Sequence, residues 1–176
     1  DKRRTVGRID SRFTGIDRDA AGEMFEYDPS ISATQGLYTA TLNDYVRREL
    51  RFESDLPYEI LTSLYKKWDY SKHQNQFLNV AETLRKTMSQ NPFLKVFVAN
   101  GYYDLATPYF ATEYTFNHLE LDPVLQGNIS MAYYEAGHMM YVHPPSLVQI
   151  KQDLARFIAQ AAHQEETDPY GMSPAR

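Results

Sequence analysis

Two residues in the second half of the chain have the types and the spacing needed for acid–base chemistry. Asp104 follows the apolar run KVFVANG, and His138 follows the run NISMAYYEAG. They lie 138 − 104 = 34 residues apart, about the length of one strand–helix–strand unit. A carboxylate that accepts the Nδ1 proton of an imidazole fixes the tautomer of the ring and stabilises its protonated form. The pair therefore predicts a site for general acid–base catalysis.

Other interpretations of His138 stay open. An aspartate after a strand is often a turn or cap residue, and a histidine after glycine is often structural. Glu135 and His138 have the spacing of a carboxylate-bridged metal motif, and His143 offers a second imidazole. That motif needs helices and a second copy, and no third ligand is evident. We therefore expect neither a metal nor another cofactor at this site.

A hydrolase that used this pair would also need a nucleophile. The serine of a parallel-sheet hydrolase stands in the motif G-x-S-x-G, on a strained turn between a strand and a helix. None of the ten serines in this chain has glycine two residues away on both sides. In the α/β-hydrolase order the serine precedes the aspartate and the histidine. We therefore expect the nucleophile upstream of residue 1, in a longer protein, and no activity from this chain alone.

The elements that would position the pair are strands alternating with helices. Residues 95–101 and 128–137 are apolar runs that fit buried strands. Residues 107–120 fit a helix capped by Thr107, and residues 144–162 fit a longer amphipathic helix. This order predicts an α/β fold with a parallel sheet and flanking helices. Because only two strands are visible, we expect an incomplete sheet whose open edges associate with another chain or another copy.

The pattern divides the chain into four segments. Residues 1–36 are polar and broken by glycine and proline, which predicts irregular structure. Residues 37–92 have apolar residues at helical spacing, residues 93–163 carry the strand and helix pattern, and residues 164–176 form a polar tail that we expect to be flexible. Within the second segment the spacing predicts three short helices, at residues 37–50, 57–68 and 76–89.

Composition excludes several kinds of partner. The chain has 18 basic and 23 acidic residues, a net charge of −5, which argues against nucleic-acid binding. The basic cluster near the N-terminus is expected to be a solvated segment; it comprises Lys2, Arg3, Arg4, Arg8 and Arg12. Without cysteine there is no disulfide, thiol nucleophile or cysteine-based zinc site. No apolar run reaches about 18 residues, so we expect no membrane span.

Two segments resemble the serine carboxypeptidase family, which has the α/β-hydrolase fold. VFVANGYYDLATP is similar to the block around the aspartate of that family, and YYEAGHMMYVHPP is similar to the Gly-His-Met block around its histidine. VGRIDSRFTG and FEYDPS also look like the bacterial branch of carboxypeptidase-related proteins. The resemblance is specific over about residues 93–160.

The resemblance implies a function and a place for each candidate residue. Asp104 and His138 would belong to a Ser–His–Asp triad, and Met139 and Tyr141 would line the substrate cleft. Residues 37–92 would form the helical cap over that cleft. The chain would then be the C-terminal part of a peptidase that acts on peptide substrates together with its own N-terminal portion, without a cofactor. A periplasmic or secreted location is favoured by the resemblance alone.

Two departures from the family pattern bear on the peptide substrate more than on the hydrolytic mechanism. Proline is expected soon after Gly-His-Met in the carboxypeptidases, whereas residues 140–143 intervene here before Pro144. The cysteines typical of the secreted eukaryotic members are absent. An esterase-type α/β-hydrolase is therefore one alternative. The other is a hydrolase-like interaction domain that has no catalytic function.

Overall fold

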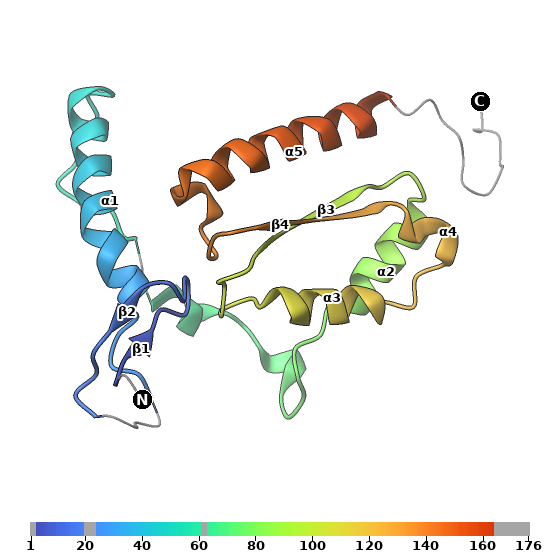
Figure 1. Ribbon diagram of the computed structural model, residues 1–176, viewed down its shortest axis with the longest axis horizontal. Coiled ribbons are helices and arrows are strands. Elements are labelled where there is room, and N and C mark those ends of the chain that lie inside the picture. Colours follow the sequence, from blue (N-terminus) through green and yellow to red (C-terminus); the bar gives the residue numbers. More distant parts are fainter. Residues whose placement is uncertain (1–2, 20–23, 61–62, 164–176) are drawn as a thin grey trace.

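The computed structural model describes residues 3–19, 24–60 and 63–163, which form a mixed α/β fold (Figure 1). Strands β3 (Val96–Gly101) and β4 (Ile129–Tyr134) pair in parallel as a small sheet. Helix α5 (Pro144–His163) packs against this sheet. A small antiparallel hairpin, β1 (Thr5–Val6) with β2 (Thr14–Gly15), lies apart from it.

The other helices lie around the sheet and beside the hairpin. In Figure 1, α5 lies on one side of β3 and β4, and α2, α3 and α4 lie on the other side, while α1 stands next to the hairpin. Their bounds are Pro29–Arg48 for α1, Ala81–Gln90 for α2, Tyr109–Asn117 for α3 and Pro123–Gln126 for α4. Three short 3-10 helices are Ser63–Lys67, Ser71–His73 and Met140–Val142. None of the described helices is long and apolar enough to cross a bilayer.

The face of the sheet that meets α5 is held by aromatic side chains. The ring of Phe97 in β3 lies 5.4 Å from that of Phe157 in α5. Tyr134 in β4 is buried and donates its hydroxyl to Asp153 of α5 over 3.0 Å. Burial and this carboxylate acceptor both raise the pKa of Tyr134, so the hydroxyl stays protonated.

The opposite face of the sheet covers the main apolar core. Val96 and Ile129, at the start of the two strands, pack against a buried cluster from the other helices and their loops. That cluster comprises Met88, Leu119, Leu121 and Leu125. Successive side chains of a strand point to opposite faces. Each strand therefore packs on this cluster with one face and on α5 with the other. The register pairs Val96 with Ile129 and Gly101 with Tyr134, and both strands therefore end at the same level.

The two predicted strands are confirmed as β3 and β4, and the two helices predicted after them are confirmed as α3 and α5. The first half of the chain differs from the prediction. Helix α1 begins at Pro29 rather than near residue 37, within the segment predicted to be irregular. The cause is a cap, because Asp28 accepts hydrogen bonds from the backbone N–H groups of Ser30 and Ile31. Pro29 occupies the first helical position, where its missing N–H costs nothing.

The predicted helix over residues 57–68 is wrong, and the one over residues 76–89 is shortened. Among the described residues of the first, only a 3-10 helix at Ser63–Lys67 forms, and Tyr65 and Trp68 are exposed. The second becomes α2, which begins at Ala81. Apolar spacing alone is not sufficient for a helix, because a short isolated helix is marginal in water. Helix α1, whose apolar side chains are also largely exposed, is 20 residues long and has the Asp28 cap. The predicted tail, residues 164–176, lies outside the described residues.

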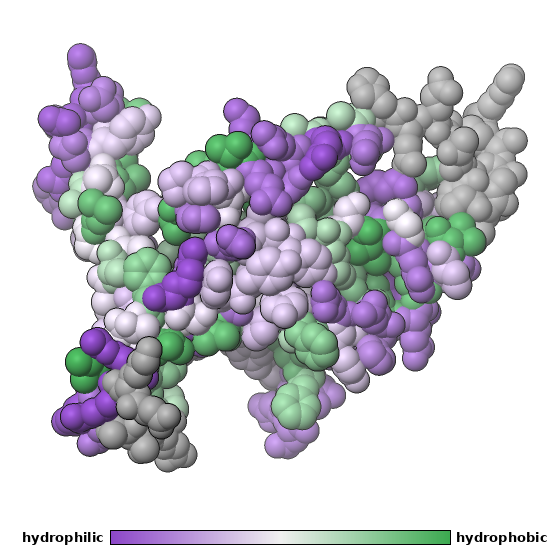
Figure 2. Space-filling view, in the orientation of Figure 1, coloured by the Kyte–Doolittle hydropathy of each residue, from purple (hydrophilic) through white to green (hydrophobic). Residues whose placement is uncertain are grey.

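Apolar side chains reach the surface on several elements. Figure 2 shows them on the visible faces of α1 and α5. Leu37 and Tyr45 of α1 and Val148 and Ile158 of α5 are all exposed. A sheet of only two strands is too small to cover the apolar faces of the helices around it, so parts of those faces stay exposed.

Candidate active site

The parallel register brings Asp104 and His138 together. Gly101 and Tyr134 end β3 and β4 side by side, so the loops that follow leave from the same edge of the sheet. Asp104 lies in the first loop and His138 in the second. His138 Nδ1 lies 2.8 Å from Asp104 Oδ2. The two residues singled out by their spacing are therefore hydrogen-bonded.

Asp104 is a buried carboxylate, and each of its oxygens accepts two hydrogen bonds. Its Oδ1 accepts hydrogen bonds from the backbone N–H groups of Ala106 (2.8 Å) and Thr107 (2.9 Å), and its Oδ2 accepts one from the Thr107 hydroxyl (2.6 Å). Burial alone would raise the pKa of Asp104, but the hydrogen bonds from Thr107, His138 and Ala106 outweigh it and lower that pKa. Asp104 is therefore ionised at neutral pH.

Thr107 has a different place from the one predicted. The sequence suggested that it caps the helix after β3, but the residue that precedes α3 is Pro108, which makes no side-chain cap. The Thr107 hydroxyl donates to Asp104 instead. A buried, ionised carboxylate is a strong hydrogen-bond acceptor and competes well for that proton. Thr107 thus belongs to the site, and its type alone did not indicate this.

The hydrogen bonds fix the tautomer of His138. An ionised Asp104 can only accept, and Thr107 already gives its single proton to it. Nδ1 of His138 must therefore donate, to Asp104 Oδ2 at 2.8 Å and more weakly toward Thr107 Oγ1 at 3.2 Å. Among the described residues no group bonds to Nε2, and 48% of the side chain is exposed. Nε2 is thus an open proton acceptor.

An N-terminal segment, residues 8–12, crosses both loops, and we call it the N-terminal brace. On the Asp104 side, Leu105 N–H donates to the carbonyl of Arg8 (3.0 Å), and Ser11 N–H donates to the carbonyl of Tyr103 (2.9 Å). These bonds join backbone segments that lie more than 90 residues apart in sequence. The loop that carries Asp104 is therefore tied to the start of the chain.

The N-terminal brace holds the His138 loop as well. The backbone N–H of His138 donates to the carbonyl of Ile9 over 2.8 Å. Arg12 Nη1 donates to the carbonyl of Glu135 over 2.8 Å. Arg12, expected to be a solvated charge, keeps 33% of its side chain exposed and makes this hydrogen bond as well. Its guanidinium lies 5.0 Å from the centre of the Tyr103 ring, between the two loops.

Two buried carboxylates keep the N-terminal brace in shape. Asp10 binds Arg12 through two oxygens, at 3.0 Å to Nε and 2.7 Å to Nη2. Asp28, which caps α1, also accepts from the N–H of Arg8 at 2.9 Å. Burial would raise the pKa of each carboxyl, but hydrogen bonds from Arg12 to Asp10, and from Ser30 and Arg8 to Asp28, lower both.

Two glycines allow the backbones to approach this closely. A Cβ on Gly137 would lie 2.4 Å from the carbonyl oxygen of Ile9 and 2.5 Å from Cβ of Asp10. A Cβ on Gly101 would lie 2.4 Å from the carbonyl oxygen of Gly137. Neither position has room for a side chain. Gly137 therefore precedes His138 because the N-terminal brace packs directly against the backbone at this position.

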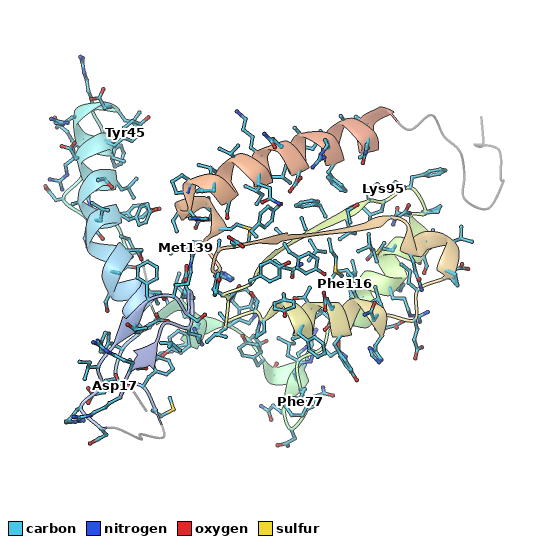
Figure 3. The ribbon with its side chains drawn as sticks, in the orientation of Figure 1. Asp17, Tyr45, Phe77, Lys95, Phe116 and Met139 are labelled. Carbon is cyan, nitrogen blue, oxygen red and sulfur yellow. The ribbon has the colours of Figure 1, made fainter. Side chains whose placement is uncertain are left out.

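Met139 and Tyr141, expected to line a cleft, lie beside His138 in the wall of a cavity of about 400 Å³. Met139, labelled in Figure 3, lies where the loop after β4 faces α1. Glu135 and His143 do not gather with His138 into a metal site: no group of three or more His, Asp or Glu side chains that could hold a metal occurs among the described residues. His143 Nδ1 instead lies 2.8 Å from Ser146 Oγ.

Comparison with known proteins adds no relative. No family model matches this chain, and no match was found among the curated proteins or the solved structures.

A substitution at Gly137 should displace the N-terminal brace. Gly137→Ala places a methyl group against backbone atoms, so we expect the free energy of unfolding to fall by about 1–3 kcal/mol. The matched control is Gly127→Ala, where a Cβ meets nothing within 4 Å. That control should equal the wild type or gain up to about 1 kcal/mol. Urea unfolding measures both, and equal effects of the two substitutions would contradict this packing.

The buried carboxylates predict acid sensitivity. Because folding lowers the pKa of Asp10, Asp28 and Asp104, their contribution is fully present above the ordinary value of 3.8 and is lost as pH falls through the folded values. The free energy of unfolding should therefore decrease below about pH 4. Asp28→Asn should flatten that decrease, whereas Asp55→Asn, at an exposed position, should not. Urea titrations at pH 3 and pH 7 measure the decrease in the free energy of unfolding between the two pH values. An equal decrease in Asp28→Asn and Asp55→Asn would contradict the role given to Asp28.

Proposed function

We propose that this chain is the C-terminal part of a serine hydrolase of carboxypeptidase type, with the α/β-hydrolase fold, and supplies the aspartate and histidine of its triad. The observation that carries the proposal is the 2.8 Å hydrogen bond from His138 Nδ1 to the buried Asp104, with Nε2 left open. Reactive groups of open parallel sheets gather at the carboxyl ends of adjacent strands, which is where this pair lies.

The pair would act on a serine from the N-terminal portion of the same protein. His138 Nε2 takes the proton of the serine hydroxyl as its oxygen attacks the acyl carbonyl. The resulting imidazolium is stabilised by the ionised Asp104, which stays ionised throughout. His138 then gives the proton to the leaving amine, and water releases the acyl group by the same steps. Asp104 and Thr107 keep the ring oriented so that Nε2 faces the nucleophile.

Peptides are the proposed substrates because of the resemblance to the carboxypeptidases around Asp104 and His138. In this proposal residues 37–92 correspond to the cap of the fold, and the open edges of the sheet pair with strands from the N-terminal portion. Among the described residues β3 pairs with β4 alone, which leaves both outer edges available.

A second candidate is a hydrolase-like interaction domain with no catalytic function. It is favoured by the absence of a G-x-S-x-G serine from this chain and by the exposed apolar side chains of α1 and α5. The two functions differ in their chemistry. Only the hydrolase carries a serine whose reactivity depends on His138.

A serine-reactive fluorophosphonate tests the proposal on the full-length protein. We expect covalent labelling of one serine in the wild type. His138→Ala should lower the labelling rate by about 10³-fold or more, because the proton acceptor is lost, and Asp104→Asn should lower it by about 10³–10⁴-fold. The control is His118→Ala on an exposed histidine stacked on Tyr114, which should label at the wild-type rate.

The outcomes separate the candidates. An unlabelled, folded wild-type protein would favour the interaction domain. Labelling that is equally fast in His138→Ala would show that the serine is activated by another base and would overturn the proposed role of this pair. Hydrolysis of ester substrates without hydrolysis of peptides would favour an esterase.

A further inference from the structure

A cavity of about 400 Å³ lies between the loop after β4 and helix α1. His138, Met139 and Tyr141 contribute one wall, and Ile31, Thr34 and Tyr38 of α1 contribute another. The remaining wall includes Ile9 of the N-terminal brace, and Ile60. The cavity is thus built by four segments of the chain that meet beside His138.

The lining offers no counter-charge from an acidic or a lysine or arginine side chain. No Asp, Glu, Lys or Arg side chain lines this cavity. Its surface is largely apolar, from Ile9, Ile31 and Ile60, the thioether of Met139 and the rings of Tyr38 and Tyr141, and Gln35 adds a neutral amide. The Thr34 hydroxyl is already used, because it donates to the carbonyl of Ser30 over 2.9 Å. A charge that entered this cavity would lose its water without gaining a counter-charge.

The position of the cavity identifies its occupant. Because His138 forms part of its wall, a group seated in the cavity lies beside the imidazole whose Nε2 is open. A substrate whose scissile bond is at Nε2 would therefore direct its nearest side chain into this space. Cavities that hold small ligands measure about 300–1,000 Å³, so this one has room for an aromatic side chain.

We infer that this cavity is a specificity pocket that takes an uncharged, apolar side chain of the substrate residue next to the scissile bond. The inference rests on the proposed function and adds the substrate class to it. Ile31 and Tyr38, one face of α1, set the width of the pocket. Their placement depends on Asp28, which both caps α1 and holds the N-terminal brace that brings Ile9 to the opposite side.

Binding of uncharged and charged probes to the full-length protein tests the pocket directly. The probes are N-acetyl amides of phenylalanine, aspartate and lysine, and the readout is NMR of ¹³C-methyl methionine at Met139 and of the His138 ring. The phenylalanine probe should give saturable shifts at both residues. Its Kd should be at least about tenfold lower than those of the charged probes, because they gain no counter-charge.

Two tryptophan variants on the same helix provide the matched comparison. Ile31→Trp fills the pocket and should abolish the shifts from the phenylalanine probe, whereas Ala33→Trp, at an exposed position outside the lining, should retain them. In the active protein, kcat/KM for peptides with phenylalanine beside the scissile bond should exceed that for aspartate or lysine. Ile31→Trp should reduce that preference, whereas Ala33→Trp should retain both the preference and the wild-type fluorophosphonate labelling rate.

The inference and the proposed function fail in different ways. Absence of saturable shifts at Met139 and His138 with the phenylalanine probe, or equal affinity for all three probes, would overturn the pocket even if His138-dependent labelling is found. Loss of the shifts in Ala33→Trp as well as in Ile31→Trp would also overturn it. Saturable, selective binding in a protein that no serine probe labels would overturn the proposed function and leave the apolar site intact.

Discussion

The arrangement of the candidate site depends on one backbone contact, between the N-terminal brace and the two loops that leave β3 and β4. Parallel pairing brings those loops to one edge of the sheet, where Tyr103 N–H also donates to the carbonyl of Ala136 over 3.0 Å. The carbonyl of Ile9 holds His138 N–H, and the carbonyl of Arg8 holds Leu105 N–H. Because these two carbonyls belong to adjacent residues, the N-terminal brace holds both loops at once.

Three buried carboxylates stabilise this contact and the site beside it, each through different hydrogen bonds. Asp28 joins the brace to α1, Asp10 holds Arg12 across Tyr103, and Asp104 orients His138. In each case the hydrogen-bond donors outweigh the cost of burial, so the carboxylate stays ionised. The same segment therefore anchors the two loops and, through Ile9, forms a wall of the cavity beside His138.

The sequence predicted the strands and the Asp–His pair because both follow from local pattern and from the geometry of parallel strands. Asp104 and His138 each follow a short apolar run, and adjacent parallel strands must end at one edge. The N-terminal brace could not be predicted in this way. Its bonds to the loops from Arg8, Ile9 and Ser11 join backbone atoms, which any residue possesses, and only Arg12 adds a side-chain bond. In the sequence, Gly137 is the one sign that a backbone passes close to His138. The helix expected at residues 57–68 failed because apolar spacing alone does not stabilise so short a helix in water.

The tautomer of His138 decides whether Nε2 can accept a proton, because that role requires the ring proton to be on Nδ1. Long-range ¹H–¹⁵N NMR of the imidazole, recorded on the 176-residue chain above the pH at which the ring titrates, distinguishes the two nitrogens. We expect a protonated Nδ1 and an unprotonated Nε2 in the wild type, with that preference lost in Asp104→Asn. A ring protonated on Nε2 in the wild type, or one whose tautomer does not respond to Asp104→Asn, would contradict it.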